Sequence, residues 1–363
     1  MTYSTVSQMF NQVTSENSSR DLYFYKKAGN WVGISGSEIR STVKDIAFGL
    51  QSLGIGKGSN IALLSNNSPR WAMSDYGIIC SGAATVSVYP TLISSQVEYI
   101  LKDSISKVVF AENQEQMEKV MAVWENCPQL THAVVMDDSN TETDNRIINF
   151  LDFLDSGTKY EQETETSFDD LTAKPEPNDL LTLIYTSGTT GNPKGVMLSH
   201  GNMMSNVEGI KQDISFDQTE IFLSFLPLSH SFERMGGHFT AFSVGAQVYY
   251  AESIETVPDN LREVKPSVVL SVPRLYEKMY AKVIRNAKFK LMYDCAKAIQ
   301  KKGLIPYGPF LKGGLTCGRF VYKTVRSSQA AMISQLSIII ADVTLRIPII
   351  KRLVMKYYYD YRI

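Results

Sequence analysis

Short apolar runs alternate with helix-like stretches between Asn60 and Asp138. The runs read NIALLS, ATVSVY, KVVFAE and HAVVMD, and the stretches between them include PRWAMSDYGIICSGA and QEQMEKVMAVWENC. Strands that are buried on both faces read as nearly continuous apolar segments, and helices connect them when they are parallel. The alternation therefore predicts repeated β-α-β units and a largely parallel sheet with helices on its faces.

A second alternating block begins at Leu180. Its strand-like runs are LLTLIYTS, IFLSFLPLSH and SVVLSV, and its helix-like stretches are HGNMMSNVEGIKQDI and SIETVPDNLREVKP. Residues 139–180, between the blocks, are acidic and polar, which is typical of a surface connection. Each block is expected to form its own sheet, so residues 1–284 predict an α/β fold with two stacked β-α-β sub-domains.

A helix is predicted upstream of the first block. Apolar residues recur there at spacings of three and four, and Gly54 follows as a residue that can stop a helix. The apolar residues are Ile39, Val43, Ile46, Ala47 and Leu50.

The overall composition is that of a soluble globular protein. Hydrophobic residues make up 44% of the 363 positions and charged residues 20%, which suits a chain with about two domain-sized cores. The N-terminal residues lack a basic stretch followed by an apolar one, and no run of about 18 apolar residues occurs. Neither a signal peptide nor a spanning helix is predicted, and a cytoplasmic location is expected.

The cysteines and histidines show no metal-binding or disulfide spacing. The sequence contains no CxxC pair and no HExxH motif. No structural metal is predicted, and the cysteines are expected to be buried, reduced thiols. These cysteines are Cys80, Cys127, Cys295 and Cys317.

The apolar run LLTLIY leads into a loop, TSGTTGNPKG, that is rich in glycine and hydroxyl side chains. Glycines lack a Cβ and so let backbone N–H groups approach phosphate oxygens closely, and the hydroxyls add further donors. Lys194 adds a compact positive charge that suits phosphate. The loop is therefore predicted to bind phosphate. Its predicted binding residues are Thr186, Ser187, Gly188, Thr189, Thr190, Gly191 and Lys194.

Two other interpretations of this loop are weaker. A P-loop NTPase needs glycine before the lysine and Ser or Thr after it, and Pro193 and Gly195 occupy these positions. A flexible polar turn would also be rich in Ser, Thr and Gly. That interpretation leaves the preceding strand, the lysine and the following GVMLSHGN unexplained.

The longer run YTSGTTGNPKGVMLSHGN resembles the signature of the adenylate-forming, AMP-binding superfamily, which includes acyl-CoA synthetases, luciferases and the adenylation domains of peptide synthetases. The resemblance implies that the loop holds the β- and γ-phosphates of ATP while a substrate carboxylate attacks the α-phosphate. It also implies Mg²⁺, with the Thr186 hydroxyl as the loop ligand for the metal, and CoA as co-substrate of a second half-reaction. A carboxylate is already ionised at neutral pH, so the first step needs charge neutralisation and in-line positioning, to which Lys194 would contribute.

A second motif, FLPLSHSFERMGGH, indicates which class of carboxylic acid would be activated. Its LPLSHSFER form resembles the long-chain fatty acid branch of the superfamily, as does PSVVLSVPRLYEKMY. By itself His230 reads as a polar residue at a helix entry, but the resemblance places it beside the acyl-binding cleft, so Lys194 and His230 are the predicted catalytic residues. The neighbouring Glu233 and Arg234 are expected in a helix-surface or buried ion pair, and His238 is expected to be structural.

The resemblance covers roughly residues 20–283 and stops before several motifs of the family. No GGAPL-like turn, YGxTE-type segment, later ribose-binding aspartate or lid lysine is found. The sequence therefore predicts an incomplete AMP-binding domain of a long-chain fatty acid CoA ligase over residues 1–284, truncated before the C-terminal lid and weak or inactive alone. Another acid-activating enzyme, for aryl or amino acids, and a non-catalytic fragment that binds ATP or fatty acid are the alternatives.

Residues 285–363 are strongly basic. They carry 15 Lys and Arg against 3 Asp and Glu, whereas residues 1–284 carry 21 against 34. Basic side chains alternate there with aliphatic stretches and tyrosines, which is typical of a helix on an anionic membrane surface. The alternative is that these helices would pack against the part of the domain that is missing here, and that their exposed apolar surface serves no membrane binding. Nucleic-acid binding is not predicted, because no recognisable reader motif accompanies the charge.

Overall fold

The computed structural model describes residues 3–137, 144–186, 192–273 and residue 277. The chain divides into two units, Met1–Leu270 and Ser271–Ile363, and the helices and strands given below belong to the first. Within the described residues, no helix is both long enough and apolar enough to cross a lipid bilayer.

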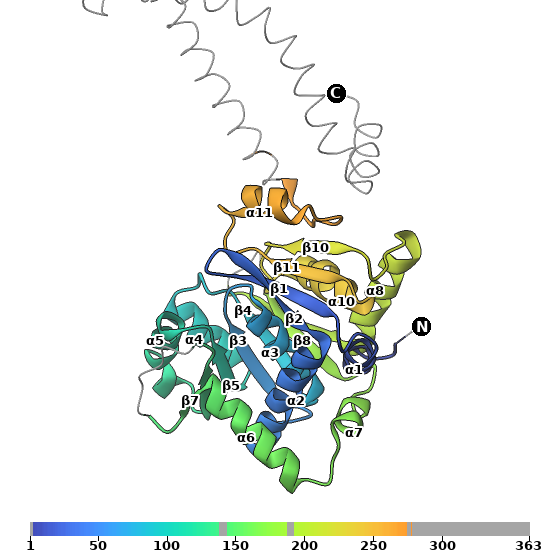
Figure 1. The fold of residues 1–363 in the computed structure, drawn as a ribbon. Helices are drawn as coiled ribbons and strands as arrows, with labels where there is room; N and C mark the ends of the chain where they lie inside the picture. Colours follow the sequence, from blue (N-terminus) through green and yellow to red (C-terminus); the bar gives the residue numbers. More distant parts are fainter. Residues whose placement is uncertain (1–2, 138–143, 187–191, 274–276, 278–363) are drawn as a thin grey trace, which may run out of the picture. The chain divides into compact units, whose positions relative to one another are not determined.

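Among these residues, a seven-stranded sheet forms the centre of the first unit (Figure 1). All of its neighbouring strands are parallel except the last pair, which is antiparallel. The α/β fold predicted from the sequence is thereby confirmed. In spatial order the strands are β7 (Ile147–Asn149), β6 (His132–Val135), β5 (Ser106–Ala111), β3 (Asn60–Leu64), β4 (Ala84–Val88), β8 (Leu180–Thr186) and β9 (Lys194–Ser199).

The two faces of this sheet are covered by different helices. Leu183 and Tyr185 of β8 belong to a core shared with α4 (Ser94–Asp103) and α5 (Gln114–Met121). On the other face, Phe110 of β5 meets Phe153 of α6 (Phe150–Glu163) at a ring distance of 5.5 Å. Helix α6 packs against α2 (Gly36–Ser52), which in turn packs against α3 (Pro69–Cys80).

Helix α2 follows the sequence signals closely. Ser35 and Glu38 form a capping box at its start, and Gly54 adopts a φ of +71° just after its end. The five apolar residues that predicted the helix are all buried, so the expected helix and its stop are confirmed.

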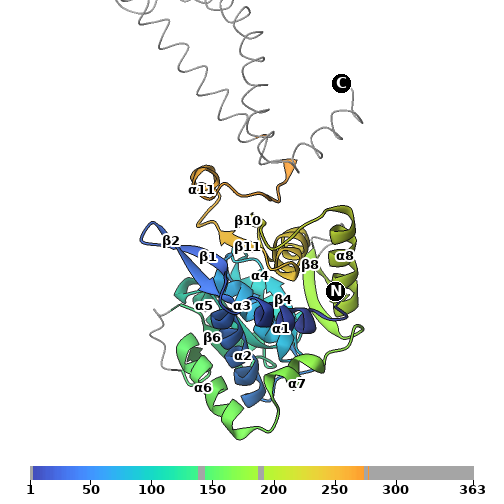
Figure 2. The same ribbon diagram turned by 45° about the vertical axis from the view of Figure 1, so that its right-hand side comes forward.

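A second, four-stranded sheet lies beyond α3 (Figure 1 and Figure 2). Its order is β10 (Ile221–Ser224), β11 (Gln247–Tyr250), β1 (Asp21–Lys27) and β2 (Asn30–Ser35). Nearly all of α3 is buried, and its Tyr76 ring lies 4.7 Å from Phe10 and 4.8 Å from Phe242. Helix α3 is therefore a shared layer between the two sheets.

The remaining described helices are short or lie at the edges. They are α1 (Val6–Glu16), α7 (Phe168–Ala173), α8 (His200–Asp213), α9 (Ser231–Glu233), α10 (Ala241–Ser243), α11 (Val257–Val264), a 3₁₀ turn (Trp124–Asn126) and a π-helical segment (Arg234–Thr240).

The expectation that each sequence block has its own sheet is wrong. Strands β8 and β9 of the second block join the first sheet, where Leu183 pairs with Val86 of β4. Conversely, β1 from the N-terminal region pairs with β11 of the second block. The expected strand SVVLSV makes only an isolated bridge, Val268 with Phe222.

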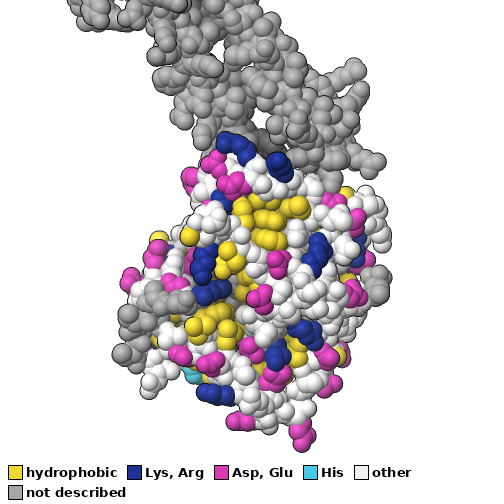
Figure 3. Space-filling model, viewed as in Figure 1, with side chains coloured by type: hydrophobic (Ala, Val, Ile, Leu, Met, Phe, Trp, Pro, Cys, Tyr) yellow, Lys and Arg dark blue, Asp and Glu magenta, His cyan; other side chains and the backbone are white. Residues whose placement is uncertain are grey.

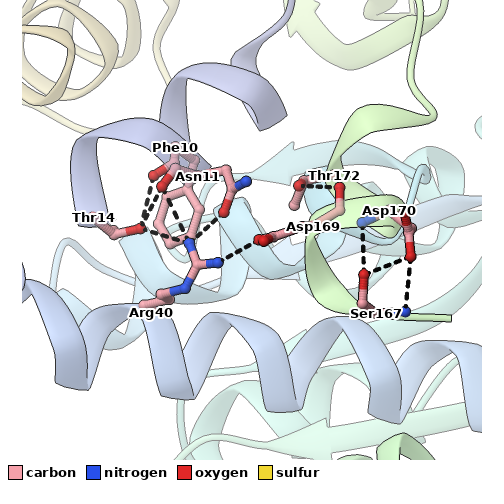
Figure 4. Close-up of polar contacts among 8 residues, drawn as sticks. All are labelled: Phe10, Asn11, Thr14, Arg40, Ser167, Asp169, Asp170 and Thr172. Carbon is pink, nitrogen blue, oxygen red and sulfur yellow. Dashed lines mark hydrogen bonds and ion pairs between the residues drawn. The ribbon is translucent and has the colours of Figure 1, made fainter. Parts of the chain in front are cut away.

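The range 139–180 contains β7, α6 and α7. Arg40 of α2 ties this region to α1, as Figure 4 shows. Its guanidinium donates to the Asn11 carbonyl at 3.1 Å and to the Thr14 hydroxyl at 3.2 Å, and it pairs with Asp169 of α7 at 2.6 Å. The segment between the blocks is thus held on the domain by strand β7, by helices α6 and α7, and by an ion pair.

The surface drawn in Figure 3 carries acidic and basic side chains side by side, with apolar areas between them.

Candidate functional site

The predicted phosphate loop connects two antiparallel strands. Thr186 ends β8 and pairs directly with Lys194, which begins β9. Residues 187–191 of the predicted loop lie outside the described residues. Side chains of directly paired residues lie on one face with Cβ atoms about 5 Å apart. Both side chains are exposed, so a hydroxyl and an ammonium group stand together at the two ends of the loop.

Strand β9 is a feature that the sequence pattern did not reveal. The residues after the loop pair back onto β8, and helix α8 begins only at His200, with the Ser199 side chain accepting the Asn202 N–H as the N-cap. The predicted helix after Ser199 is confirmed. Phosphate binding here would rest on loop amides, hydroxyls and Lys194 and not on a helix N-terminus.

The base of the loop is fixed by two tyrosines. The Tyr99 hydroxyl of α4 donates to the Pro193 carbonyl at 3.0 Å, and the Tyr185 hydroxyl donates to Asp103 at 2.6 Å. Burial and the Asp103 carboxylate raise the pKa of Tyr185, so this hydroxyl remains a donor. A Cβ at Gly195 would lie only 3.1 Å from the Tyr185 ring, so the glycine lets Tyr185 pack across the hairpin.

The LPLSH segment leaves the second sheet and docks on the first. The Asn67 side chain, just beyond β3, donates to the Leu226 carbonyl at 2.6 Å and accepts the Leu228 N–H at 2.8 Å. The Ser229 hydroxyl donates to the carbonyl of Val88, the last residue of β4, at 3.3 Å. Carboxyl ends of strands from both sheets therefore meet, which is where α/β folds place their ligand sites.

His230 is the last residue of this docked segment and is exposed. Its Nδ1 accepts the Phe232 N–H at 3.2 Å, so in the neutral ring the proton is on Nε2, which becomes a donor. Ser87 of β4 pairs with Ile184 of β8, and adjacent strands are about 4.8 Å apart. His230 is thus placed at the end of β4, next to the strand whose end carries Thr186.

Glu233 and Arg234 were expected to form an ion pair with each other, but each has another partner. Arg234 is fully buried and forms an ion pair, but the partner is Asp75, with Nε donating to Oδ2 at 3.0 Å. Glu233 accepts from the Ser224 hydroxyl at 2.7 Å, and burial raises its pKa to about 8. His238, predicted to be structural, is buried with its Nε2 3.5 Å from Asp75.

The predicted thiols and the basic segment are described only in part. Cys80 and Cys127 are free and buried, as expected, and burial raises the pKa of both thiols. Cys295, Cys317 and the whole of 285–363 lie outside the described residues.

A model of the family described as AMP-binding enzyme matches residues 11–327. The chain belongs to this family. The long-chain-fatty-acid–CoA ligase ACSBG1 of Macaca fascicularis is 31% identical over 286 residues, which cover 77% of this chain and 39% of the relative. Fatty acyl-CoA synthetase A of Dictyostelium discoideum is 29% identical over 276 residues, or 73% of this chain and 39% of the relative. The chain spans about two fifths of the length of these relatives.

Solved structures share the fold of this AMP-binding family member. An anthranilate CoA ligase in complex with anthranoyl-AMP has a TM-score of 0.64 at 21% identity, over 75% of this chain and 50% of that one. A long-chain-fatty-acid-CoA ligase from Archaeoglobus fulgidus has a TM-score of 0.63 at 21% identity, over 75% and 52%. The N-terminal domain of FACL13 from Mycobacterium tuberculosis has a TM-score of 0.60, over 76% and 64%. At this identity the likeness establishes the fold alone.

Three residues at or beneath this site escaped sequence reasoning. Asn67 holds the LPLSH segment, and Asp75 and Thr182 hold Arg234. Asn67 lies between a predicted strand and a predicted helix, and Asp75 lies within that helix. The roles of both residues depend on partners about 160 residues away. Such contacts leave no local signal in one sequence.

Proposed function

We propose that this chain supplies the phosphate end of the nucleotide site in an AMP-forming long-chain fatty acid–CoA ligase. The observation that carries the proposal is the placement of Thr186 and Lys194 opposite each other at the carboxyl edge of the sheet, at the ends of the loop TSGTTGNPKG. The names of the relatives support a long-chain fatty acid as the acid that is activated.

In the proposed first half-reaction, a fatty acid carboxylate oxygen forms a bond to the α-phosphorus of ATP. The bond from that phosphorus to the bridging oxygen breaks, and pyrophosphate leaves with the electron pair. The carboxylate is the nucleophile in its ionised form, so no side chain need remove a proton. Lys194 would neutralise charge on the departing phosphates, and a second half-reaction would pass the acyl group from AMP to the CoA thiol.

The side chains of Thr186 and Lys194 suit the binding of a phosphate group together with Mg²⁺. An exposed hydroxyl and an exposed ammonium on one face of the hairpin are the donor types that phosphate attracts, and Lys194 forms no salt bridge with any residue that the structure describes. When bound, Mg²⁺ would withdraw charge from the phosphate oxygens, with the Thr186 hydroxyl as its protein ligand. His230 would present its Nε2–H toward the reacting end of the nucleotide.

The test uses the purified 363-residue chain with ATP, Mg²⁺ and a panel of acids. The proposal expects the chain to bind Mg²⁺–ATP, and expects any pyrophosphate release to be weak and larger with long-chain fatty acids than with benzoate-type acids or amino acids. Release that depends on an aryl or amino acid would assign the chain to another acid-activating enzyme. ATP binding without release under any acid would fit a phosphate loop without the lid and would identify the chain as the non-catalytic fragment. Robust pyrophosphate release together with acyl-CoA formation would contradict the expectation that the chain is weak or inactive alone, and a chain that binds no ATP would contradict the proposed phosphate site.

We further propose that residues 285–363, with 15 basic and 3 acidic side chains, bind an anionic membrane surface. Flotation with vesicles of phosphatidylcholine and phosphatidylserine tests this. Salt-sensitive flotation is expected, and flotation that is absent or independent of phosphatidylserine would contradict the proposal.

A further inference from the structure

A cluster of buried polar side chains joins the His230 segment to the strand that leads into the phosphate loop. The residues are Asp75 of α3, Thr85 of β4, Thr182 of β8 and Arg234 of the π-helical segment, and all four are fully buried. We call this set the Arg234 cluster. None of them belongs to the predicted site.

Hydrogen bonds link every member of the cluster. Arg234 donates through Nε and Nη2 to the two oxygens of Asp75, and through Nη1 to the Thr182 hydroxyl at 2.5 Å. The Thr182 hydroxyl donates to the Thr85 carbonyl at 2.7 Å, and the Thr85 hydroxyl donates to Asp75 at 2.7 Å. The guanidinium is therefore held by a carboxylate on one side and by β8 on the other.

Stability alone is a weak reason for such a cluster. Removing two charges from water costs several kcal/mol, and well-packed apolar side chains of similar volume often replace a buried ion pair without loss. A guanidinium does supply a rigid planar fork, which fixes the direction of several partners at once. The bonds to Asp75 and Thr182 thus suit a role in geometry.

The cluster is bonded to the elements that carry the two parts of the predicted site. Side chains along a strand alternate between faces, so Thr182 and Thr186 of β8 point to the same face, about 13 Å apart. Arg234 lies one helical turn after His230, and its N–H donates to the His230 carbonyl at 3.1 Å. One guanidinium therefore connects the turn that carries His230 with the strand that carries Thr186.

The backbone around Arg234 is unusual in a way that fits this role. The segment Arg234–Thr240 is π-helical, and such segments occur frequently at functional sites. A Cβ at Gly236 would lie 2.6 Å from Leu270, and one at Gly237 would lie 2.5 Å from Glu233. The two glycines allow this close packing, which restricts movement of the segment. The polar contacts of Arg234 then fix its position.

We propose that Arg234, held by Asp75 and Thr182, is a positioning residue that sets the orientation of His230 relative to the phosphate loop. Any effect of this orientation on ATP binding rests on the proposed function. The orientation itself can be measured without any ligand.

The experiment follows the four histidines by nitrogen and carbon NMR in the full 363-residue chain, with His230→Asn used to assign the His230 signals. Thr182→Val removes the hydroxyl that Arg234 contacts, and Thr182→Ser restores it. Ser106→Ala removes a buried hydroxyl in β5 of the same sheet, away from the cluster, and controls for a general loss of stability.

The proposal expects a single Nε2–H tautomer for His230 in the unmodified chain, in Thr182→Ser and in Ser106→Ala, and a mixture of tautomers in Thr182→Val. Unchanged His230 signals in Thr182→Val would overturn it. If Thr182→Val does not fold, Arg234→Lys gives the same test, because a lysine at this position can pair with Asp75 without also reaching Thr182.

A second measurement links the geometry to the nucleotide. His230→Asn should weaken Mg²⁺–ATP binding about tenfold in the unmodified chain, which is the loss of one hydrogen bond to a charged group, and about twofold or less in Thr182→Val. Equal losses in both backgrounds would contradict the positioning role. If the unmodified chain binds no ATP, the proposed function fails, and the ligand-free signals of His230 still decide whether Arg234 positions it.

Discussion

The Asn67 side chain accepts the backbone N–H of Leu228 at 2.8 Å, across the boundary between the two sheets. The same amide group donates to the Leu226 carbonyl at 2.6 Å. Both contacts fix the segment that leads into His230 above the end of β3. A side chain from one sheet thus sets the path of a loop from the other.

Asn67→Ala should destabilise the fold and weaken nucleotide binding together. The substitution leaves an N–H and a carbonyl of the LPLSH segment unpaired, which should lower the free energy of unfolding by about 1–2 kcal/mol. The measurement is urea unfolding combined with an ATP titration. Asn66→Ala is the matched control, since Asn66 is exposed and its side chain donates to Glu112, away from the LPLSH segment, and it should change either quantity little. Equal effects of the two variants would contradict the role of Asn67.

His200 should make the fold sensitive to acid. It is buried at the start of α8, where its Nδ1 accepts the Val6 N–H at 3.2 Å, and burial lowers its pKa to about 4. The unfolded chain, with a pKa near 6.5 at this residue, binds a proton more readily, so stability is lost as pH falls from 6.5 to 4, by up to roughly 3 kcal/mol.

Urea unfolding of the unmodified chain and of His200→Asn between pH 7 and pH 4 tests this contribution. The unmodified chain should be more stable at pH 7, and the gap should narrow toward pH 4. A gap of constant size across the range would show that His200 does not titrate in this way.

Glu233 should have the opposite pH dependence. Burial raises its pKa from 4.5 to about 8, so the folded chain binds the proton more tightly, and stability is lost as pH rises from 4.5 toward 8. Glu233→Gln removes this ionisation and keeps an acceptor for the Ser224 hydroxyl. The variant should gain about 1–3 kcal/mol at pH 8 and little at pH 5.

Glu118→Gln, on the exposed side of α5, controls for the loss of one negative charge. A Glu233→Gln chain that is less stable than the unmodified one at pH 8 would show that the carboxylate form is needed by the fold.

Local signals predicted the individual elements better than their partners. The periodicity and the capping residues of α2 were sufficient for that helix, and Ser199 marked the start of α8. The sheets were harder, because β4 pairs with β8 almost 100 residues later, and nothing within either strand specifies this. Strand β9 was missed because GVMLS follows a glycine-rich loop and has exposed positions on an edge, which blurs the strand pattern.

In the candidate site, too, residues within local motifs were predicted and long-range partners were not. Thr186, Lys194 and His230 were predicted because they lie in contiguous motifs, and the structure places Thr186 beside Lys194. The partner of Arg234 was not predictable from its neighbour Glu233, because burial favours the bidentate contact with Asp75 of α3 and leaves Glu233 with the Ser224 hydroxyl.

The most direct test of the phosphate site is calorimetric titration of the 363-residue chain with Mg²⁺–pyrophosphate, compared with Lys194→Ala. Lys159→Ala, an exposed lysine on α6, is the matched control. Loss of one charge-assisted contact should weaken binding at least about tenfold in Lys194→Ala, while Lys159→Ala binds as the unmodified chain does. Equal affinity of all three chains, or no binding by the unmodified chain, would contradict a phosphate site at Thr186 and Lys194.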